Sequence, residues 1–269
     1  MSATLIRLGH EISALRARLQ PPSEPFTREQ MAHRLGIDLD PWQAEALGSD
    51  AQQLLINASR QSGKSTIAAL LGLHQILSAP DQLVLVVSPG ERQSKLLFRT
   101  LLNFWRALGK PVAATSENVL SLELANGSAA YALPGSEATV RGFSAVDLLL
   151  VDEASRVPDD LIAATRPMLA VSGGRLVATS TPFGKRGWWF GAWSEGGKDW
   201  QRFEVPATSC PRISAAFLEQ ERRSLPPMWF RSEYLCEFVQ PDDAYFDQDD
   251  VVAAVDSTII PLFGGDDAH

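Results

Sequence analysis

The sequence has few of the residues that build disulfide frameworks or transition-metal sites. It holds two cysteines, Cys210 and Cys236, and four histidines in 269 residues. The cysteines are far apart in the sequence, and no second cysteine or histidine stands near either one at the spacing of metal ligands. We therefore expect both to be ordinary packing or surface thiols, and we expect no transition-metal site.

Long apolar runs are also missing. No run approaches the roughly 20 residues that span a bilayer, and the first residues lack the apolar centre of a signal peptide. We therefore expect a cytosolic protein with no membrane partner. Because 45% of the residues are hydrophobic, the chain can bury one substantial core with a small appended subdomain.

The surplus of positive charge that often marks nucleic-acid-binding proteins is absent, since the net charge is −8. The acidity is uneven, however. Residues 241–269 hold eight aspartates and no lysine or arginine, so residues 1–240 carry 24 basic and 24 acidic side chains. The neutral body leaves nucleic-acid binding open. The acidic tail is either a solvated linker or a segment that occupies a basic surface when DNA is absent.

The spacing of apolar residues predicts an α/β fold with a mainly parallel central sheet flanked by helices. From residue 53 onward, short apolar runs alternate with longer amphipathic ones, which is the sequence form of βαβ units. The dipeptide Asn126-Gly127 predicts a β-hairpin with a type I′ turn between residues 118 and 133. We predict strands at 54–58, 83–88, 147–151 and 175–179, and helices at 64–77, 91–108, 158–169 and 215–225.

Four parts are expected along the chain. The first 50 residues are expected to form two helical stretches, which would make a lid or collar. The second stretch runs from Thr27 through Arg34 and resumes at Pro41, whose fixed φ suits a first helical turn. The expected parts are this N-terminal segment (1–50), an α/β core (51–210), a C-terminal helical lid (211–240) and the acidic tail (241–269).

The segment from Ala58 to Ser65 reads Ala-Ser-Arg-Gln-Ser-Gly-Lys-Ser and fits the P-loop pattern, with Ala58 in place of the first glycine. It follows an apolar strand and opens a helix, so backbone N–H groups can surround nucleotide phosphates. Lys64 would reach the β- and γ-phosphate oxygens, and the Ser65 hydroxyl would bind Mg²⁺. The predicted ATP-binding residues in this loop are Ser59, Arg60, Gln61, Ser62, Gly63, Lys64, Ser65 and Thr66.

A second half of the site is predicted where the apolar run Leu148–Val151 ends in two carboxylates, Asp152 and Glu153. A fully apolar strand is typical of the centre of a parallel sheet, whose carboxyl end binds ligands. Asp152 would hold Mg²⁺ through its water shell, and Glu153 could polarise the attacking water. Together the two motifs predict an ATPase that uses ATP and Mg²⁺.

Four features in this order resemble the large terminase subunits of tailed bacteriophages over residues 38–240. They are Asp40-Pro-Trp-Gln43, Arg60-Gln-Ser-Gly-Lys-Ser65, Arg141-Gly142 and Ala178-Thr-Ser-Thr-Pro182. The resemblance implies a RecA-like P-loop NTPase, the ATPase domain of a motor that moves double-stranded DNA into a procapsid. It also implies a portal protein and a small terminase subunit as partners. The chain would form a homo-oligomeric ring on the portal and be a monomer in isolation. It would act in the host cytoplasm and would not be a stable part of the mature virion.

The resemblance also assigns roles to residues around the phosphate site. Gln43 would read the adenine edge beside Trp42, although a core tryptophan at a helix start is the alternative. Arg60 would add a second cation near the γ-phosphate or be an exposed loop charge. Arg141 matches the position of an arginine finger, which a neighbouring subunit would supply to stabilise charge in the transition state. Arg60 is the other candidate for that role. The alternative for Arg141 is a loop arginine that only pairs with a carboxylate.

Two further sets of residues concern coupling and DNA. Ser180 and Thr181 match the family's coupling motif, and a strand cap is the alternative. One face of the predicted helix 91–108 is basic and suits contact with DNA phosphates, or it is only a solvated face. The candidate DNA-binding residues on or near that face are Arg92, Lys95, Arg99, Arg106 and Lys110.

The large terminase subunits usually carry a nuclease domain after the ATPase. We expect none in this chain, and we do not assign Asp247, Asp249 and Asp250 as nuclease ligands, since they stand outside any apolar strand. One alternative is a superfamily 2 helicase fragment, although the second RecA-like domain that helicases need is not evident. The other is a nucleotide-binding scaffold without turnover, which would need neither Glu153 nor Arg141.

Overall fold

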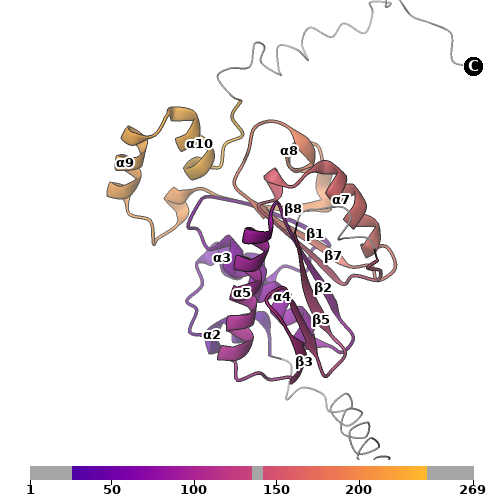
Figure 1. Ribbon diagram of the computed structural model, residues 1–269. Coiled ribbons are helices and arrows are strands. Elements are labelled where there is room, and N and C mark those ends of the chain that lie inside the picture. The colour runs from indigo at the N-terminus through magenta and orange to yellow at the C-terminus, as the bar shows by residue number, and fades with distance from the viewer. Residues whose placement is uncertain (1–25, 135–141, 241–269) are drawn as a thin grey trace, which may run out of the picture.

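An eight-stranded sheet forms the centre of the protein. The computed structural model describes residues 26–134 and 142–240. The strand order is β3-β4-β5-β2-β6-β7-β1-β8, and the six strands from β5 to β8 in that order pair in parallel, with β3 and β4 antiparallel at one edge (Figure 1). The strands are β1 (Gln53–Ala58), β2 (Leu83–Ser88), β3 (Ala114–Glu117), β4 (Ser121–Leu124), β5 (Ala129–Pro134), β6 (Leu148–Asp152), β7 (Arg175–Ser180) and β8 (Trp200–Val205).

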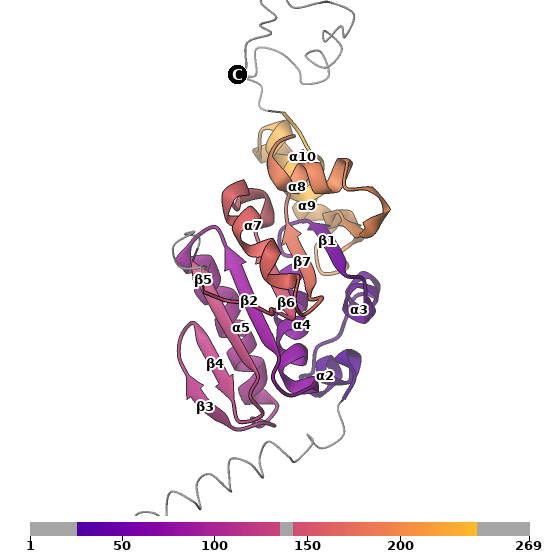
Figure 2. The same cartoon turned by 90° about the vertical axis from the view of Figure 1, so that its right-hand side faces the viewer.

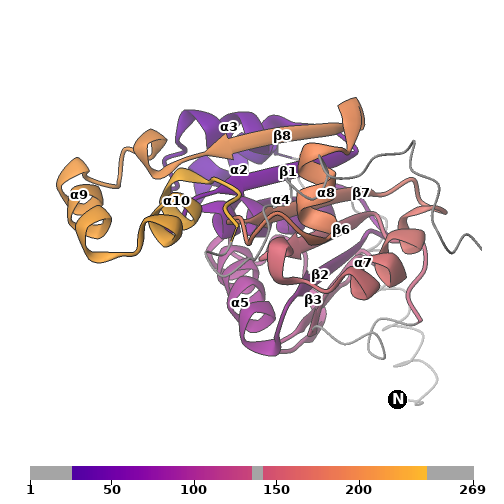
Figure 3. The same cartoon turned by 90° about the horizontal axis from the view of Figure 1, so that it is seen from above.

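Helices cover both faces of the sheet (Figure 3). One apolar cluster joins the sheet to α2, α3, α4 and α5, and a second joins the other face to α7 and α8. Alternate residues of β1 divide between the two clusters, with Leu54 and Ile56 in the first and Leu55 in the second. The helices are α2 (Arg28–Arg34), α3 (Pro41–Gly48), α4 (Lys64–Ser78), α5 (Glu91–Ala107), α7 (Asp159–Thr165), α8 (Gly187–Ser194), α9 (Ala215–Ser224) and α10 (Pro227–Leu235).

The predicted α/β architecture is confirmed, and the four predicted strands correspond to β1, β2, β6 and β7. Leu148, Leu149, Leu150 and Val151 are all buried, as expected for a central parallel strand with helices on both faces. The sequence did not predict β8, which mixes buried and exposed positions at the sheet edge, or α8 and α10.

Two local predictions were wrong. The helix predicted over 158–169 ends as α7 at Thr165 and continues as 3₁₀ helix (Arg166–Leu169), because Pro167 has no N–H for the α-helical ladder. The hairpin between β4 and β5 exists, but its turn is not type I′. Only Gly127 has positive φ, whereas a type I′ turn needs it at both central residues.

The described part of the expected N-terminal segment packs into the main core. Met31 and Ala32 of α2 and Ala46 and Leu47 of α3 are fully buried in the cluster that also holds α4. At the other end, α9 and α10 pack together around a small cluster of Leu218, Phe230 and Tyr234, beyond the sheet (Figures 1 and 2). In the part of the chain that the structure describes, no helix is long and apolar enough to cross a membrane.

Helix α4 is the most buried helix and should be sensitive to truncation. Leu70 on α4 is fully buried, so Leu70→Ala should lower the free energy of unfolding by about 2–5 kcal/mol, through lost apolar contacts and the cavity left behind. Leu96→Ala on α5 is the matched control, since Leu96 is 45% exposed. Urea denaturation of both variants measures the difference, and equal losses would contradict this assignment of the core.

Candidate functional site

The carboxyl ends of parallel strands meet the P-loop at one edge of the sheet. The loop leaves β1 at Ala58, and Gly63 is the N-cap of α4. Gln61 and Gly63 both have positive φ, at 61° and 92°, which folds the loop back around its own N–H groups. Within the described residues, the N–H groups of Gly63, Lys64 and Ser65 donate no hydrogen bond, so they are available to a phosphate.

An open pocket of about 760 Å³ lies over this loop. Its walls come from the P-loop, the start of α5, the short 3₁₀ helix after β6 (Ala154–Arg156), the end of β7 and the start of α10. Its volume is within the range of ligand pockets. The lining residues are Arg60, Gln61, Gly63, Lys64, Ser65, Thr66, Gln93, Glu153, Arg156, Thr181 and Trp229.

The two carboxylates at the end of β6 lie on the other side of Lys64. Lys64 Nζ is 3.7 Å from Glu153 Oε1, and Lys64 is itself buried. Asp152 is buried too, and its Oδ1 accepts a hydrogen bond of 2.8 Å from the Thr179 hydroxyl on β7. Burial raises the pKa of Asp152, and the charge of Glu153 acts in the same direction. The two predicted motifs therefore meet in one place.

The backbone at Glu153 is in the left-handed region, with φ 52° and ψ 43°. This conformation is uncommon for a residue with a long side chain, and such strain clusters at functional sites. Since Asp152 ends a strand, the turn sends the two carboxylates in different directions. Glu153 lines the open pocket, whereas Asp152 stays buried against β7.

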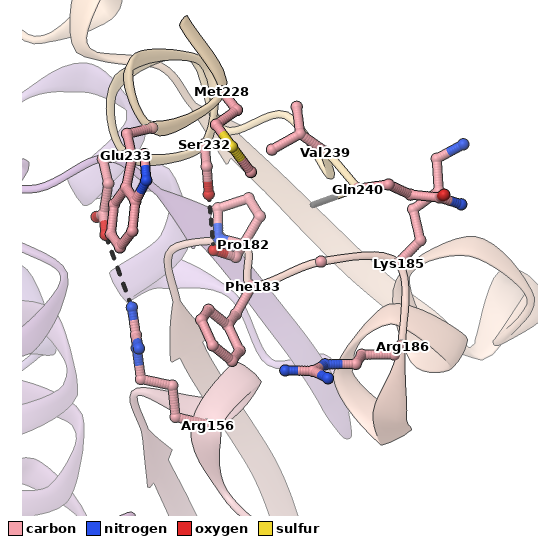
Figure 4. Close-up of a pocket in the computed structure, with 12 residues that line it drawn as sticks. Arg156, Pro182, Phe183, Lys185, Arg186, Met228, Ser232, Glu233, Val239 and Gln240 are labelled. Carbon is pink, nitrogen blue, oxygen red and sulfur yellow. Dashed lines mark hydrogen bonds and ion pairs between the residues drawn. The ribbon is translucent and has the colours of Figure 1, made fainter. Parts of the chain in front are cut away.

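The end of β7 connects the pocket to two other elements. The Ser180 hydroxyl bonds to the Ser155 hydroxyl at 2.8 Å and accepts from the Ser155 N–H at 3.0 Å, which ties β7 to the turn after Glu153. Thr181 lines the pocket. The residue after Thr181 is Pro182, and its backbone carbonyl accepts a 2.9 Å hydrogen bond from the Ser232 hydroxyl of α10 (Figure 4).

A buried carboxylate on α10, that of Glu233, faces two arginines. Arg60 Nε donates to Glu233 Oε2 at 2.8 Å, and this partner raises the pKa of Arg60. Arg156 lies 3.7 Å from the other carboxylate oxygen and stacks on Phe183, with 4.3 Å from its guanidinium carbon to the ring centroid (Figure 4). Both arginines line the pocket, but in this structure a protein carboxylate is their partner.

Four predicted ATP-binding side chains lie behind the loop. Trp42 packs against the main core, and Ser59 is fully buried. The Ser62 hydroxyl donates to the Ser59 carbonyl at 2.8 Å. Gln43 is buried, and both ends of its amide are bound to backbone, at Asp40 N–H and Ser62 C=O. In this arrangement the amide groups of Gln43 that would read an adenine edge are bonded to the backbone.

Three of the five candidate DNA-binding side chains on or near α5 are paired with carboxylates. Lys95 bonds to Glu91, and Glu117 of β3 holds both Arg106 and Lys110. Within the described residues, Arg92 and Arg99 are exposed and have no ion-pair partner. The positive charge of this surface is therefore concentrated on Arg92 and Arg99.

Several side chains at the site had no role in the predictions from sequence. Arg156 stands three residues after Glu153, and this closeness was its only signal. Glu233, Gln93 and Arg212 come from segments without a recognised motif, and only the fold brings them to the loop. Arg141, Asp247, Asp249 and Asp250 lie outside the described residues.

The prediction for the two cysteines was confirmed. Cys210 and Cys236 are both buried free thiols. Of the aromatic residues near 190, Trp189 is buried in the second apolar cluster, with Trp188 and Trp193 packed against it. These tryptophans therefore pack in the core.

The family match and the related sequences all point to the large subunits of phage terminases. Residues 55–253, more than half of the chain, match the family described as terminase large subunit, T4likevirus-type, N-terminal. The terminase large subunit of Escherichia phage T5 is 28% identical over 197 residues, which cover 70% of this chain and 44% of that protein. The chain thus spans less than half the length of this curated relative.

Solved structures give the same fold. The large terminase ATPase domain of Thermus phage P74-26 superposes with a TM-score of 0.70 at 21% identity, covering 82% of this chain and 100% of that domain. A large terminase from a thermophilic bacteriophage, solved in complex with ATP-γ-S, has a TM-score of 0.60 at 14% identity. The match covers 75% of this chain and 53% of that one.

Proposed function

The chain belongs to the family of terminase large subunits, and on that premise we propose that it hydrolyses Mg-ATP to move double-stranded DNA into a viral procapsid. The observation that carries the proposal is the meeting of Lys64, Ser65 and Glu153 in one open pocket, with Asp152 directly beside it. The large terminase from the thermophilic bacteriophage was solved with ATP-γ-S, which supports ATP as the nucleotide.

The residues around the loop suit a phosphate chain. The free N–H groups at the start of α4 and the ammonium of Lys64 would bind the β- and γ-phosphate oxygens. Thr66, Gln61 and Gly63 complete the wall of the pocket. No single donor has to neutralise the phosphates, because the helix terminus and Lys64 act together.

The donor set also fits Mg²⁺. Among the described residues, no group of three or more His, Cys, Asp or Glu could hold a metal ion. Mg²⁺ needs no such cage, since it keeps several waters and takes one or two protein ligands together with phosphates. The Ser65 hydroxyl and the Asp152 carboxylate would hold it, and the ion would supply charge neutralisation at the phosphates.

Glu153 is the residue that would orient and polarise the attacking water. It lines the pocket, and its contact with Lys64 keeps it at the phosphate end. When Lys64 turns to the phosphates, the Glu153 carboxylate becomes free to accept a hydrogen bond from water. Arg60 would then add a second cation near the γ-phosphate, and Arg141 of a neighbouring subunit would stabilise the transition state.

Coupling to movement would begin at the end of β7. Thr181 lines the pocket, Ser180 bonds to the turn after Glu153, and Pro182 is bonded to α10. A change at the γ-phosphate would therefore reach α10 through consecutive residues. The proposed partners are double-stranded DNA, the portal protein, the small terminase subunit and other copies of the chain in a ring, acting in the host cytoplasm.

For DNA, the exposed arginines of α5 are the best candidates on this surface. A packaging motor must bind any sequence, and phosphate contacts provide that. Lys95, Arg106 and Lys110 are partly neutralised by Glu91 and Glu117, so their contribution should be smaller. The free guanidinium groups of Arg92 and Arg99 should carry most of the binding.

The double variant Arg92→Ala/Arg99→Ala should weaken binding of double-stranded DNA equally for all sequences. Its plot of log affinity against log salt should be shallower by about two units, one for each lost phosphate contact. Fluorescence anisotropy over a salt series measures both quantities. Arg222→Ala/Arg223→Ala on α9 is the matched control, and an unchanged slope in the α5 variant would remove this surface from DNA binding.

Phosphate release from Mg-ATP, with and without DNA, tests the proposed function. We expect turnover that requires Mg²⁺ and that rises per subunit with protein concentration, since Arg141 would act between subunits. A chain that binds ATP without turnover under every condition of assembly would be a nucleotide-binding scaffold instead.

A further inference from the structure

The backbone carbonyl of Ser62, in the peptide that joins Ser62 to Gly63, accepts hydrogen bonds from two side chains that are distant in the sequence. Arg212, in the segment after β8, donates to Ser62 O from its NH2 group at 2.9 Å. Gln43 of α3 donates to the same oxygen from Nε2 at 3.1 Å. Two donors on one carbonyl use both of its lone pairs, so the orientation of this carbonyl is fixed.

Fixing this carbonyl also fixes the N–H group of the same peptide. A trans peptide is planar, and its C=O and N–H point in opposite directions. Because the Ser62 carbonyl faces Gln43 and Arg212, the Gly63 N–H faces away from them. Gly63 lines the pocket, and its N–H has no acceptor within the described residues. The direction of this donor is therefore set before any ligand arrives.

The two donors are themselves held by Asp40, the N-cap of α3. Arg212 pairs with both oxygens of Asp40, at 2.9 Å to Oδ1 and 2.8 Å to Oδ2. Gln43 accepts from the Asp40 N–H at 2.9 Å. Asp40 is buried, so the ion pair with Arg212 compensates a charge that would otherwise be costly, although Oδ2 accepts no hydrogen bond among the described residues. We call Asp40, Gln43 and Arg212 the Ser62 clamp.

Close packing leaves the loop little freedom to turn the peptide over. A Cβ at Gly63 would collide with Gln43 Nε2, so the loop and the amide are already in contact. Gly63 also needs its positive φ of 92° to keep this geometry. A peptide flip would break the bonds from Gln43 and Arg212 and leave the buried amide of Gln43 without its acceptor.

We propose that Arg212 is a positioning residue for the phosphate site, which acts through the Ser62 clamp to aim the Gly63 N–H at the nucleotide phosphates. This inference rests on the proposed function, because it assumes that the loop binds phosphates. Arg212 is not a phosphate-binding cation itself, since Asp40 neutralises it. It serves instead to link the segment that leads to α9 with the P-loop.

Binding of three ligands by two variants tests this role. Mg-ATP, Mg-GTP and inorganic tripolyphosphate share the phosphate chain but differ in the base. Arg212→Ala should weaken all three by the same factor, roughly 10- to 100-fold, the effect of losing the hydrogen bond that the aimed Gly63 N–H donates to a charged phosphate. Arg212→Lys should restore part of the affinity for all three. Arg222→Ala, an exposed arginine on α9, should bind like the unaltered chain.

The outcomes separate the alternatives. Loss confined to ATP would mean that Arg212 contacts the base, and unchanged binding of all three would mean that the clamp is dispensable; either result overturns the proposal. Thermal melting identifies a folding defect. If Arg212→Ala does not fold, Arg212→Lys is compared with the unaltered chain instead. Its affinity should then fall by a smaller factor, and that factor should be the same for all three ligands. An unaltered chain that binds none of the ligands would reject the proposed function itself.

Discussion

Glu153→Gln should lower ATP turnover by about 10²- to 10⁴-fold, the usual contribution of a positioned base. The amide keeps the size of the side chain but cannot accept a proton from water. ATP binding should persist, because the P-loop donors are untouched and Lys64 loses only one partner at 3.7 Å. Steady-state phosphate release gives the turnover, and titration with a fluorescent ATP analogue gives the affinity.

Glu195→Gln is the control for this prediction, since Glu195 is exposed beyond α8 and lines no part of the pocket. Its turnover should match that of the unaltered chain. A Glu153→Gln variant that retains turnover within about twofold would place the base elsewhere, because a lost general base costs at least about 10²-fold.

Lys64→Ala should weaken Mg-ATP binding by roughly 10- to 100-fold, since charge-assisted hydrogen bonds to phosphate contribute about 1.5–3 kcal/mol. Turnover should fall as well, because Lys64 would neutralise charge that develops on the γ-phosphate. Isothermal titration calorimetry measures the affinity directly. The remaining N–H groups of the loop explain why some binding should survive.

Lys198→Ala provides the matched control, as Lys198 is exposed in the turn before β8. Removal of this lysine should leave ATP affinity unchanged. Equal affinities for the Lys64 and Lys198 variants would mean that the pocket over the P-loop is not the nucleotide site.

The central sheet was predictable because its signal is local. Helices cover both faces of β1, β2, β6 and β7, so each strand reads as a continuous apolar run between turn residues. The P-loop and the Asp152-Glu153 pair follow two of these strands. Their meeting could be predicted because parallel strands end at the same edge of a sheet.

The edges of the fold were less predictable. β8 is a sheet edge with mixed polarity, so it lacks the apolar run of the inner strands. Helix α8 is apolar on most sides, and its residues show no helical periodicity. Helix α10 carries Glu233, whose burial against Arg60 depends on how the C-terminal helices pack over the loop.

Charges were the hardest feature to predict, because their partners lie elsewhere in the sequence. The helix α5 has no acidic residue after Glu91, which favoured a strongly basic face. Glu117 reaches this face from β3 and pairs with Arg106 and Lys110. In the same way, Arg212 meets Asp40 across 172 positions of sequence. Such pairs follow from tertiary packing and leave no local pattern.

The role of Glu153 in ATP hydrolysis is tested by steady-state phosphate release from Mg-ATP. The unaltered chain and Glu153→Gln are compared over a series of protein concentrations, with double-stranded DNA present. The unaltered chain should release phosphate in a Mg²⁺-dependent way, and the variant should release it at least about 10²-fold more slowly. The same slow release from both proteins, with ATP bound to each, would contradict a catalytic role for the site at the end of β6.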